Sequence, residues 1–192
     1  PLYKDLKYCL RGESLNPRDG TSMYYQALNY ERQEVRDYMF SLIRELVNDY
    51  DYEGLELDWL RNPFCCEPHA SRETLRLMAG WIADIRALTG AKARTTGRPY
   101  PVGLRVPGTL GLLRSIGLDV VALAQEDLID FVSPSNFWQT SWDMPHDKFK
   151  QMLGDNVTVY GVVEDAPNWL LGYSPKDKTS GPRMLSASAE FM

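Results

Sequence analysis

The sequence contains few of the residues that most often build metal and redox sites. Among its 192 residues are three cysteines, Cys9, Cys65 and Cys66, and two histidines, His69 and His146. The cysteines lack the spacing of a zinc site, and the adjacent pair does not readily bridge to itself, so they are either thiols or include one long-range disulfide. The two histidines share no motif spacing. We therefore expect no metal and no cofactor.

A basic cluster and a long apolar run are also missing. The 21 lysines and arginines are scattered and are outnumbered by 26 acidic residues, which gives a formal net charge of -5. Without a basic face to neutralise phosphates, nucleic acid is not an expected partner. No apolar run approaches the roughly 18 residues that a membrane-spanning helix needs, so we expect no membrane span. The sequence begins at Pro1 without a signal-type segment, and any targeting sequence is expected upstream of it.

What the chain does contain is enough apolar material for a core and a repeating order of elements. Hydrophobic residues make up 44% of the sequence, and the length suits one domain over residues 1–192. After about twenty residues, short β-rich runs alternate with amphipathic stretches of helical spacing. Strands are predicted at residues 23–28, 54–59, 102–106, 128–133 and 156–165. Helices are predicted at residues 32–48, from Ser71 to a stop at Gly90, across 109–125 with a break at Gly117, and from the residue after Pro145 to Leu153. The start of one more helix is predicted at residues 185–192.

Strands separated by helices indicate a parallel sheet, because parallel neighbours need crossover connections of this length. An open doubly wound sheet has the same rhythm, but it usually carries a glycine-rich phosphate loop. Neither G-x-G-x-x-G nor G-x-x-x-x-G-K-[ST] is present. We therefore expect a (β/α)8 barrel, the TIM barrel. A complete barrel typically takes about 250 residues, so we expect that the chain holds part of one, with strands missing at both ends.

Two acids stand at alternate positions in the predicted strand "GLELDW". Because alternate side chains of a strand face opposite ways, Leu55 and Leu57 are expected to face the helices, and Glu56 and Asp58 the barrel interior. Asp58 ends its strand at the edge where barrel enzymes place catalytic groups, so it is our candidate catalytic residue. Glu56 is either a substrate-binding acid or part of a structural ion pair with a base such as Arg105.

A second acid is expected at the same edge. In "NVTVYGVVED", the alternation points Tyr160 and Glu164 to one side, and Glu164 then ends its strand at the same mouth as Asp58. Two carboxyl groups from separate strands suit glycoside hydrolysis, in which one donates a proton to the leaving oxygen and the other acts as nucleophile or base. The alternative for Glu164 is structural, capping its loop or pairing with Arg183.

Tryptophans gather where loops of one barrel face are expected. Trp59 ends a strand, Trp138 and Trp142 lie in the loop after the fourth predicted strand, and Trp169 follows the fifth, whereas Trp81 lies on a helix. Aromatic faces on such loops suit a site that stacks against the apolar side of sugar rings, although ordinary packing of long loops explains them equally well.

Four polar residues near strand ends complete the candidate site. Arg61 and Arg105 are able to hold a substrate hydroxyl or pair with a carboxylate. Asn29 and Asn136 are able to hydrogen-bond sugar hydroxyls, or they only cap turns. All four are interpreted as substrate-binding candidates.

One long segment carries a resemblance to a known group of proteins. The stretch "ALNYERQEVRDYMFSLIRELVNDYDYEGLELDWLRNPF" resembles a bacterial family of glycosyl-hydrolase-like barrels, and "GLDVVALAQEDLIDFVSPS" is similar to a later helix and strand of that family. The resemblance implies that the visible strands are the third to seventh of eight, with Asp58 ending the fourth and Glu164 the seventh. It also implies an extracytoplasmic location, periplasmic or secreted. The sequence departs from the family pattern at Glu53, where aspartate is usual, and at Tyr30, where proline is common.

These patterns favour a hydrolase of O-glycosidic bonds in a poly- or oligosaccharide, with Asp58 and Glu164 as the carboxylate pair. The alternative is a barrel that binds carbohydrate without cleaving it, which needs the aromatic residues but not the acid pair. Another barrel chemistry, such as that of a lyase or aldolase, is less favoured, because no phosphate loop and no evident Schiff-base lysine is present in a predicted strand. The sugar and the oligomeric state are left open.

Overall fold

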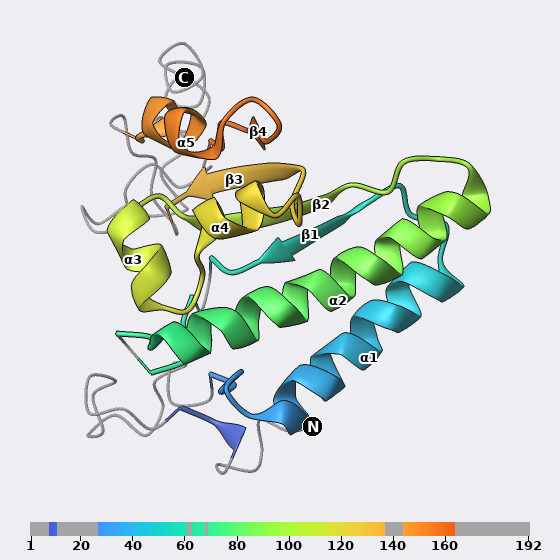
Figure 1. Cartoon of the computed structure of the whole chain (residues 1–192), viewed down its shortest axis with the longest axis horizontal. Coiled ribbons are helices and arrows are strands. Elements are labelled where there is room, and N and C mark those ends of the chain that lie inside the picture. The colour runs from blue at the N-terminus through green and yellow to red at the C-terminus, as the bar shows by residue number, and fades with distance from the viewer. Residues whose placement is uncertain (1–7, 11–26, 61–62, 68, 137–143, 164–192) are drawn as a thin grey trace, which may run out of the picture.

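The computed structural model describes residues 8–10, 27–60, 63–67, 69–136 and 144–163. These residues form a mixed α/β structure with a four-stranded parallel sheet (Figure 1). The elements in chain order are α1 (Gln33–Asp49), β1 (Leu55–Asp58), α2 (Arg72–Thr96), β2 (Val102–Pro107), α3 (Leu110–Ser115), α4 (Val120–Gln125), β3 (Phe131–Ser135), α5 (His146–Leu153) and β4 (Thr158–Val159).

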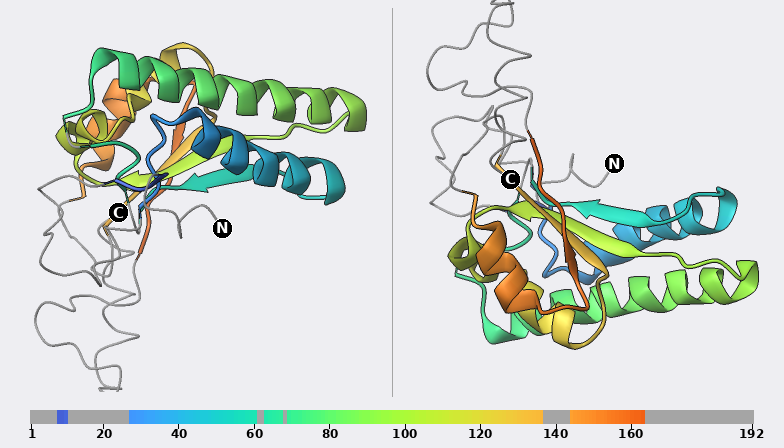
Figure 2. Two further views of the ribbon diagram at one scale, coloured as in Figure 1. Left: turned by 90° about the horizontal axis from the view of Figure 1, so that it is seen from below. Right: turned by 90° about the horizontal axis from the view of Figure 1, so that it is seen from above.

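The strands lie side by side in the order of the sequence, β1-β2-β3-β4. Each neighbouring pair is parallel, with Asp58 opposite Arg105 and Arg105 opposite Ser133. The described helices lie on one side of the sheet, and the other side has no described helix over it (Figure 2). This order and one-sided cover are shared with a part of a (β/α)8 barrel. The described sheet is not closed into a barrel, and the α/β class is what the structure establishes.

The core lies between the sheet and the helices. Every second strand residue is buried there, because alternate side chains of a strand point to the same face. On the sheet these residues are Leu57, Val102, Leu104, Val106 and Val132. On α2 they are Met78, Trp81, Ile82 and Ile85, the i, i+3, i+4, i+7 spacing that places side chains on one face of a helix. The contact between these two apolar faces holds the long helix against the sheet.

The predicted stop of α2 at Gly90 is wrong. The helix begins after Ser71, whose hydroxyl accepts a hydrogen bond from the Thr74 amide at 3.0 Å, and continues to Thr96. Gly97 then takes the left-handed conformation, with φ at 67°, that commonly ends a helix. Packing explains the longer helix: Thr89 is fully buried and Ala93 packs against the core, so the apolar face continues past Gly90.

The predicted strand at 128–133 is shifted, and β3 begins only at Phe131. Asp130 immediately before it ties three elements together. Its carboxylate accepts two hydrogen bonds from Arg86 of α2, at 2.6 and 2.9 Å, and a third from the amide of Val102 at 2.7 Å. A carboxylate held in this way anchors the start of two strands to α2, and the backbone becomes regular strand only after it.

Most other elements agree with the predicted ones. The helices at 32–48 and up to Leu153 are confirmed, and the region 109–125 is two helices separated at Gly117, where φ is 97°. The strands at 54–59 and 102–106 are also confirmed within one or two residues. The strand at 156–165 is described only as far as residue 163, and its paired part is Thr158–Val159.

The predicted strand at 23–28 falls largely outside the described residues. Its last two residues, Ala27 and Leu28, are described, and Leu28 forms an isolated antiparallel bridge with Cys9. The helical segment expected at the end of the chain also lies outside the described residues.

Two glycines test the packing of the sheet and of α2 in opposite directions. A methyl group at Gly103 would lie 2.1 Å from the ring of Phe131, whereas at Gly80 of α2 it would meet nothing within 4 Å. We expect Gly103→Ala to lower the free energy of unfolding by about 1–3 kcal/mol, because the ring is displaced. Gly80→Ala should raise it by about 0.5–1 kcal/mol, because alanine favours the helix. Urea denaturation of both variants measures this, and a Gly103→Ala protein as stable as the parent would contradict the described packing.

Candidate functional site

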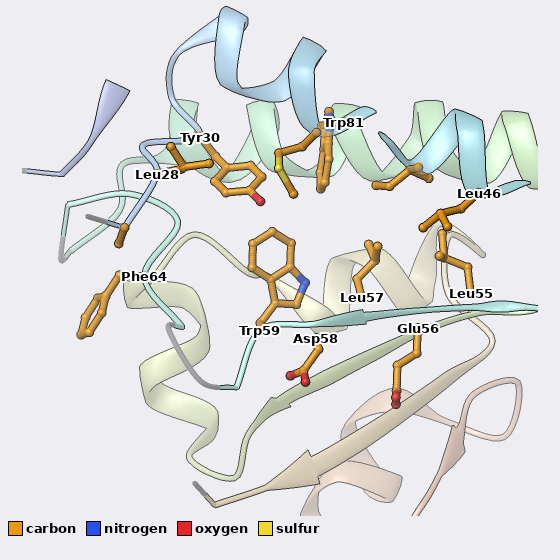
Figure 3. A pocket seen from close by; sticks show the side chains of 13 residues that line it. Leu28, Tyr30, Leu46, Leu55, Glu56, Leu57, Asp58, Trp59, Phe64 and Trp81 are labelled. Atoms are coloured by element: carbon orange, nitrogen blue, oxygen red, sulfur yellow. The ribbon is translucent and has the colours of Figure 1, made fainter. Parts of the chain in front are cut away.

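The face of the sheet without helices carries both acids of β1. Glu56 and Asp58 are exposed, whereas Leu57 between them is buried among the helices. Figure 3 shows the two carboxylates on the opposite side of β1 from Trp59, Trp81 and the leucines. The alternation predicted for this strand is therefore confirmed. We call this surface the open face.

Asp58 is held at the carboxyl end of β1 by two nearby donors. Its Oδ1 accepts a hydrogen bond from the Leu60 amide at 2.9 Å. Its Oδ2 lies 3.5 Å from Nη1 of Arg105, which stands opposite it on β2. The side chain of Asp58 is nevertheless 51% exposed, so the carboxylate is oriented by protein donors and still accessible to a ligand.

Glu56, two residues earlier, is hydrogen-bonded across the sheet. Ser133 of β3 donates its hydroxyl hydrogen to Oε1 of Glu56 at 2.7 Å. Ser133 is buried and Glu56 is exposed. Their hydrogen bond makes a polar patch that extends over the open face from β1 to β3. The sequence allowed two interpretations of Glu56, a substrate-binding acid or a structural ion pair with a base such as Arg105. The ion pair that the structure describes for Arg105 is with Asp58.

Trp59 does not share the open face with the carboxylates. It is 7% exposed and lies on the helix side of β1. Its ring meets Tyr30 at 5.2 Å and Trp81 at 6.2 Å between centroids, both with the rings edge to face. Such edge-to-face contacts are favourable in a core. Trp59 is thus a core residue, and the sugar-stacking role predicted for it has no support from its position.

A groove of about 600 Å³ runs beside β1 on the helix side (Figure 3). Its walls are mostly apolar and come from β1, α1, α2 and the segment before α1. Residues of α1 that line it include Met39, Ile43 and Leu46. Glu56 and Asp58 also border this groove, but Figure 3 shows their carboxylates on the other side of β1 from its apolar walls.

Of the remaining predicted site residues, the structure describes Asn29 and Asn136. Asn29 accepts a hydrogen bond from the Glu31 amide at 2.9 Å and shapes the turn before α1, which is the turn-capping role considered for it. Asn136 directly follows β3, at the same edge of the sheet as Asp58. Predicted site residues that lie outside the described residues are Arg61, Trp138, Trp142, Glu164 and Trp169.

Three residues of the open face were missed as site candidates. Ser133 hydrogen-bonds Glu56, and Phe131 and Tyr160 place their rings 5.4 Å apart between centroids. The signal that identifies them is the same alternation that identified Asp58. In "DFVSPS", Phe131 and Ser133 alternate with the buried Val132, and Tyr160 had already been assigned to the side of Glu164.

The cysteine pair belongs to the core and not to a reactive site. Cys65 and Cys66 are fully buried thiols, and Cys65 donates a hydrogen bond to the carbonyl oxygen of Ile116. The hydrogen bond with Cys66 and burial raise the pKa of Cys65 well above its usual range. A thiol of this kind is a poor nucleophile. Gly117 leaves room for both sulfurs, since a methyl group there would lie 3.1 and 3.2 Å from them.

Metal-binding groups and membrane-spanning helices are both absent from the described residues. No group of three or more histidine, cysteine or acidic side chains there is arranged to hold a metal ion. No helix in the described ranges has both the length and the apolar character needed to cross a bilayer.

Comparison with known proteins gives no match, either to a family model or to a curated protein sequence. The glycosyl-hydrolase resemblance of the sequence thus stays a prediction.

The buried cysteines predict slow modification of the folded protein. We expect Cys65 and Cys66 to react with iodoacetamide at neutral pH roughly 100-fold more slowly, or slower still, in the native chain than in concentrated guanidinium chloride, because both thiols are buried and the raised pKa of Cys65 opposes formation of its thiolate. Mass spectrometry of timed samples measures the two rates for the peptide that carries both residues. Equal rates in the two conditions would show that the loop after β1 is not packed as described.

Proposed function

We propose that this chain forms part of a (β/α)8 barrel that hydrolyses O-glycosidic bonds in a poly- or oligosaccharide. The observation that carries the proposal is the position of Asp58: an exposed carboxylate at the carboxyl end of a parallel strand, on the face that no described helix covers. Barrel enzymes place their catalytic groups at this edge of the strands.

The free edge of β1 supports the barrel. Leu55 donates its amide hydrogen to Pro101, directly before β2, and Trp59 donates its own to Arg105 of β2, both at 2.9 Å. The main chain of Glu56 and Asp58 therefore faces the opposite edge of β1. Within the described residues the sheet has no strand there. The indole nitrogen of Trp59 beside this edge is buried and has no hydrogen-bond partner in the described part of the chain, although buried polar groups are nearly always paired. A further parallel strand in the groove would give hydrogen-bond partners both to the main chain of Glu56 and Asp58 and to the indole nitrogen of Trp59.

The proposed reaction uses two carboxyl groups. One protonates the oxygen of the leaving sugar while the other, as a carboxylate, attacks the anomeric carbon or activates water. Asp58 is one member of the pair, and Arg105 and the Leu60 amide hold its oxygens in place. Glu164 is the proposed second member. A separation of about 5 to 5.5 Å between the two groups would imply retention of configuration, and about 6.5 to 9.5 Å would imply inversion.

Removing the charge of Asp58 should abolish turnover and leave the fold intact. We expect Asp58→Asn to lower kcat/KM for oligosaccharide cleavage by at least about 1,000-fold, because the amide provides neither a proton nor a nucleophile. Stability should change by no more than about 1 kcal/mol, because the carboxylate is half exposed and its ion pair is solvent-screened. Reducing-end release measures activity, and thermal denaturation measures the fold.

The matched control is Asp84→Asn, the same chemical change at an exposed position of α2 on the helix side. This variant should keep full activity. An Asp58→Asn protein that is folded and active would remove Asp58 from the reaction.

A barrel that binds carbohydrate without cleaving it is the second candidate. The observation that favours it is that both acids of β1 already have protein partners, Ser133 for Glu56 and Arg105 for Asp58. Acids used in this way can hold sugar hydroxyls without taking part in a reaction. Sugar binding by the unmodified protein without any reducing-end release would select this alternative.

A further inference from the structure

Four side chains form one row across the open face. Asp58 stands opposite Arg105, and Arg105 stands opposite Ser133. Val132 stands opposite Val159, and the Tyr160 amide donates to the Val132 carbonyl oxygen at 2.9 Å, so Tyr160 follows Ser133 in the same row. Residues in register on neighbouring strands point to the same face. The ring of Tyr160 and the carboxylate of Asp58 therefore open onto the same surface.

Phe131 packs against the ring of Tyr160 on the open face. The two rings meet edge to face, with centroids 5.4 Å apart and planes at 74°. Phe131 itself occupies the space over Gly103, where even a methyl group would approach its ring to 2.1 Å. A glycine on β2 thus allows one aromatic ring to lie on the sheet and to fix the second. Tyr160 is 53% exposed, so this fixed ring keeps a free side.

The surroundings of Tyr160 differ from those of the other exposed tyrosines. Tyr50 and Tyr52 stack on each other in the segment before β1, at the edge of the sheet opposite to Asp58, and Tyr38 lies on α1. Tyr160 alone among these four lies in a row with a carboxylate, a guanidinium and a hydroxyl. An aromatic face next to several hydrogen-bonding groups suits a sugar ring, which has an apolar side and a rim of hydroxyls.

We propose that Tyr160, supported by Phe131, is the stacking residue of a sugar subsite separate from the bond that is cleaved. This inference rests on the proposed function for its choice of ligand. Three steps between strands, each about 4.8 Å, put Tyr160 about 14 Å from Asp58 along the sheet. One sugar ring does not reach both residues, so the subsite requires a ligand of several linked sugars. The exposed carboxylate of Glu56, which reaches across the sheet to Ser133, provides a hydrogen-bond partner for a sugar hydroxyl on the same face.

The test is oligosaccharide binding to the Asp58→Asn form of the protein, which cannot consume the ligand. The probes are the hexasaccharides of β-1,4-glucose, β-1,4-xylose, β-1,4-mannose and α-1,4-glucose, together with the methyl glycoside of each sugar, in isothermal titration calorimetry. We expect at least one hexasaccharide to bind and its methyl glycoside to bind at least tenfold more weakly. Tyr160→Ala should weaken hexasaccharide binding at least about tenfold, whereas Tyr160→Phe, which keeps the ring, should stay within about threefold.

Tyr38→Ala, which removes an exposed tyrosine from α1, is the matched control and should bind as the parent does. Circular dichroism of each variant verifies the fold. Unchanged binding by Tyr160→Ala would overturn the subsite, and so would an equal loss in Tyr160→Ala and Tyr160→Phe, because the hydroxyl and not the ring would then hold the ligand. Failure of every hexasaccharide to bind would overturn it as well.

Cleavage of the same hexasaccharides by the unmodified protein separates this result from the proposed function. Cleavage that Asp58→Asn abolishes but Tyr160→Ala leaves unchanged would preserve the hydrolase and remove the subsite. Binding that depends on the Tyr160 ring in a protein without cleavage would preserve the subsite and remove the hydrolase.

Discussion

The packing of one face of a parallel sheet against α2 is the interaction on which the remaining structure depends. Leu57, Leu104 and Val132 can bury their side chains only if alternate residues on the same strands point away from the helices. The positions of Asp58 and Tyr160 on the open face follow from that packing. Burial of the apolar face stabilises the folded chain. The alternation of side chains along each strand then decides which of them remain available for a ligand.

Alternation along the strands was the most informative property of the sequence. It correctly separated Glu56 and Asp58 from Leu57, and applied to Trp59 it would have assigned that residue to the core, two positions after Leu57. We predicted sugar stacking for Trp59 from its position at the end of a strand, without taking account of the side to which its ring points. The same rule applied to β3 would have identified Phe131 and Ser133.

Element boundaries were predicted less well, because distant contacts decide them. Gly90 is a plausible helix stop when only its neighbours are considered, but the burial of Thr89 and the packing of Ala93 extend α2 to Thr96. The start of β3 depends on Asp130, whose partners Arg86 and Val102 are 44 and 28 residues away. The pattern of neighbouring residues in the sequence does not indicate such a distant contact. The closure of the sheet into a barrel stays a proposal for a related reason, since it depends on strands that are not among the described residues.

In the proposed function, the open face of the sheet is the inner wall of a sugar-binding cavity that two acids share. A crystal structure of the protein with a bound oligosaccharide tests it most directly, through the separation of the carboxyl groups of Asp58 and Glu164. We expect both groups to contact the sugar and to lie no more than about 9.5 Å apart. A Glu164 side chain directed toward the helices, or a sugar bound in the groove beside α1, would contradict it.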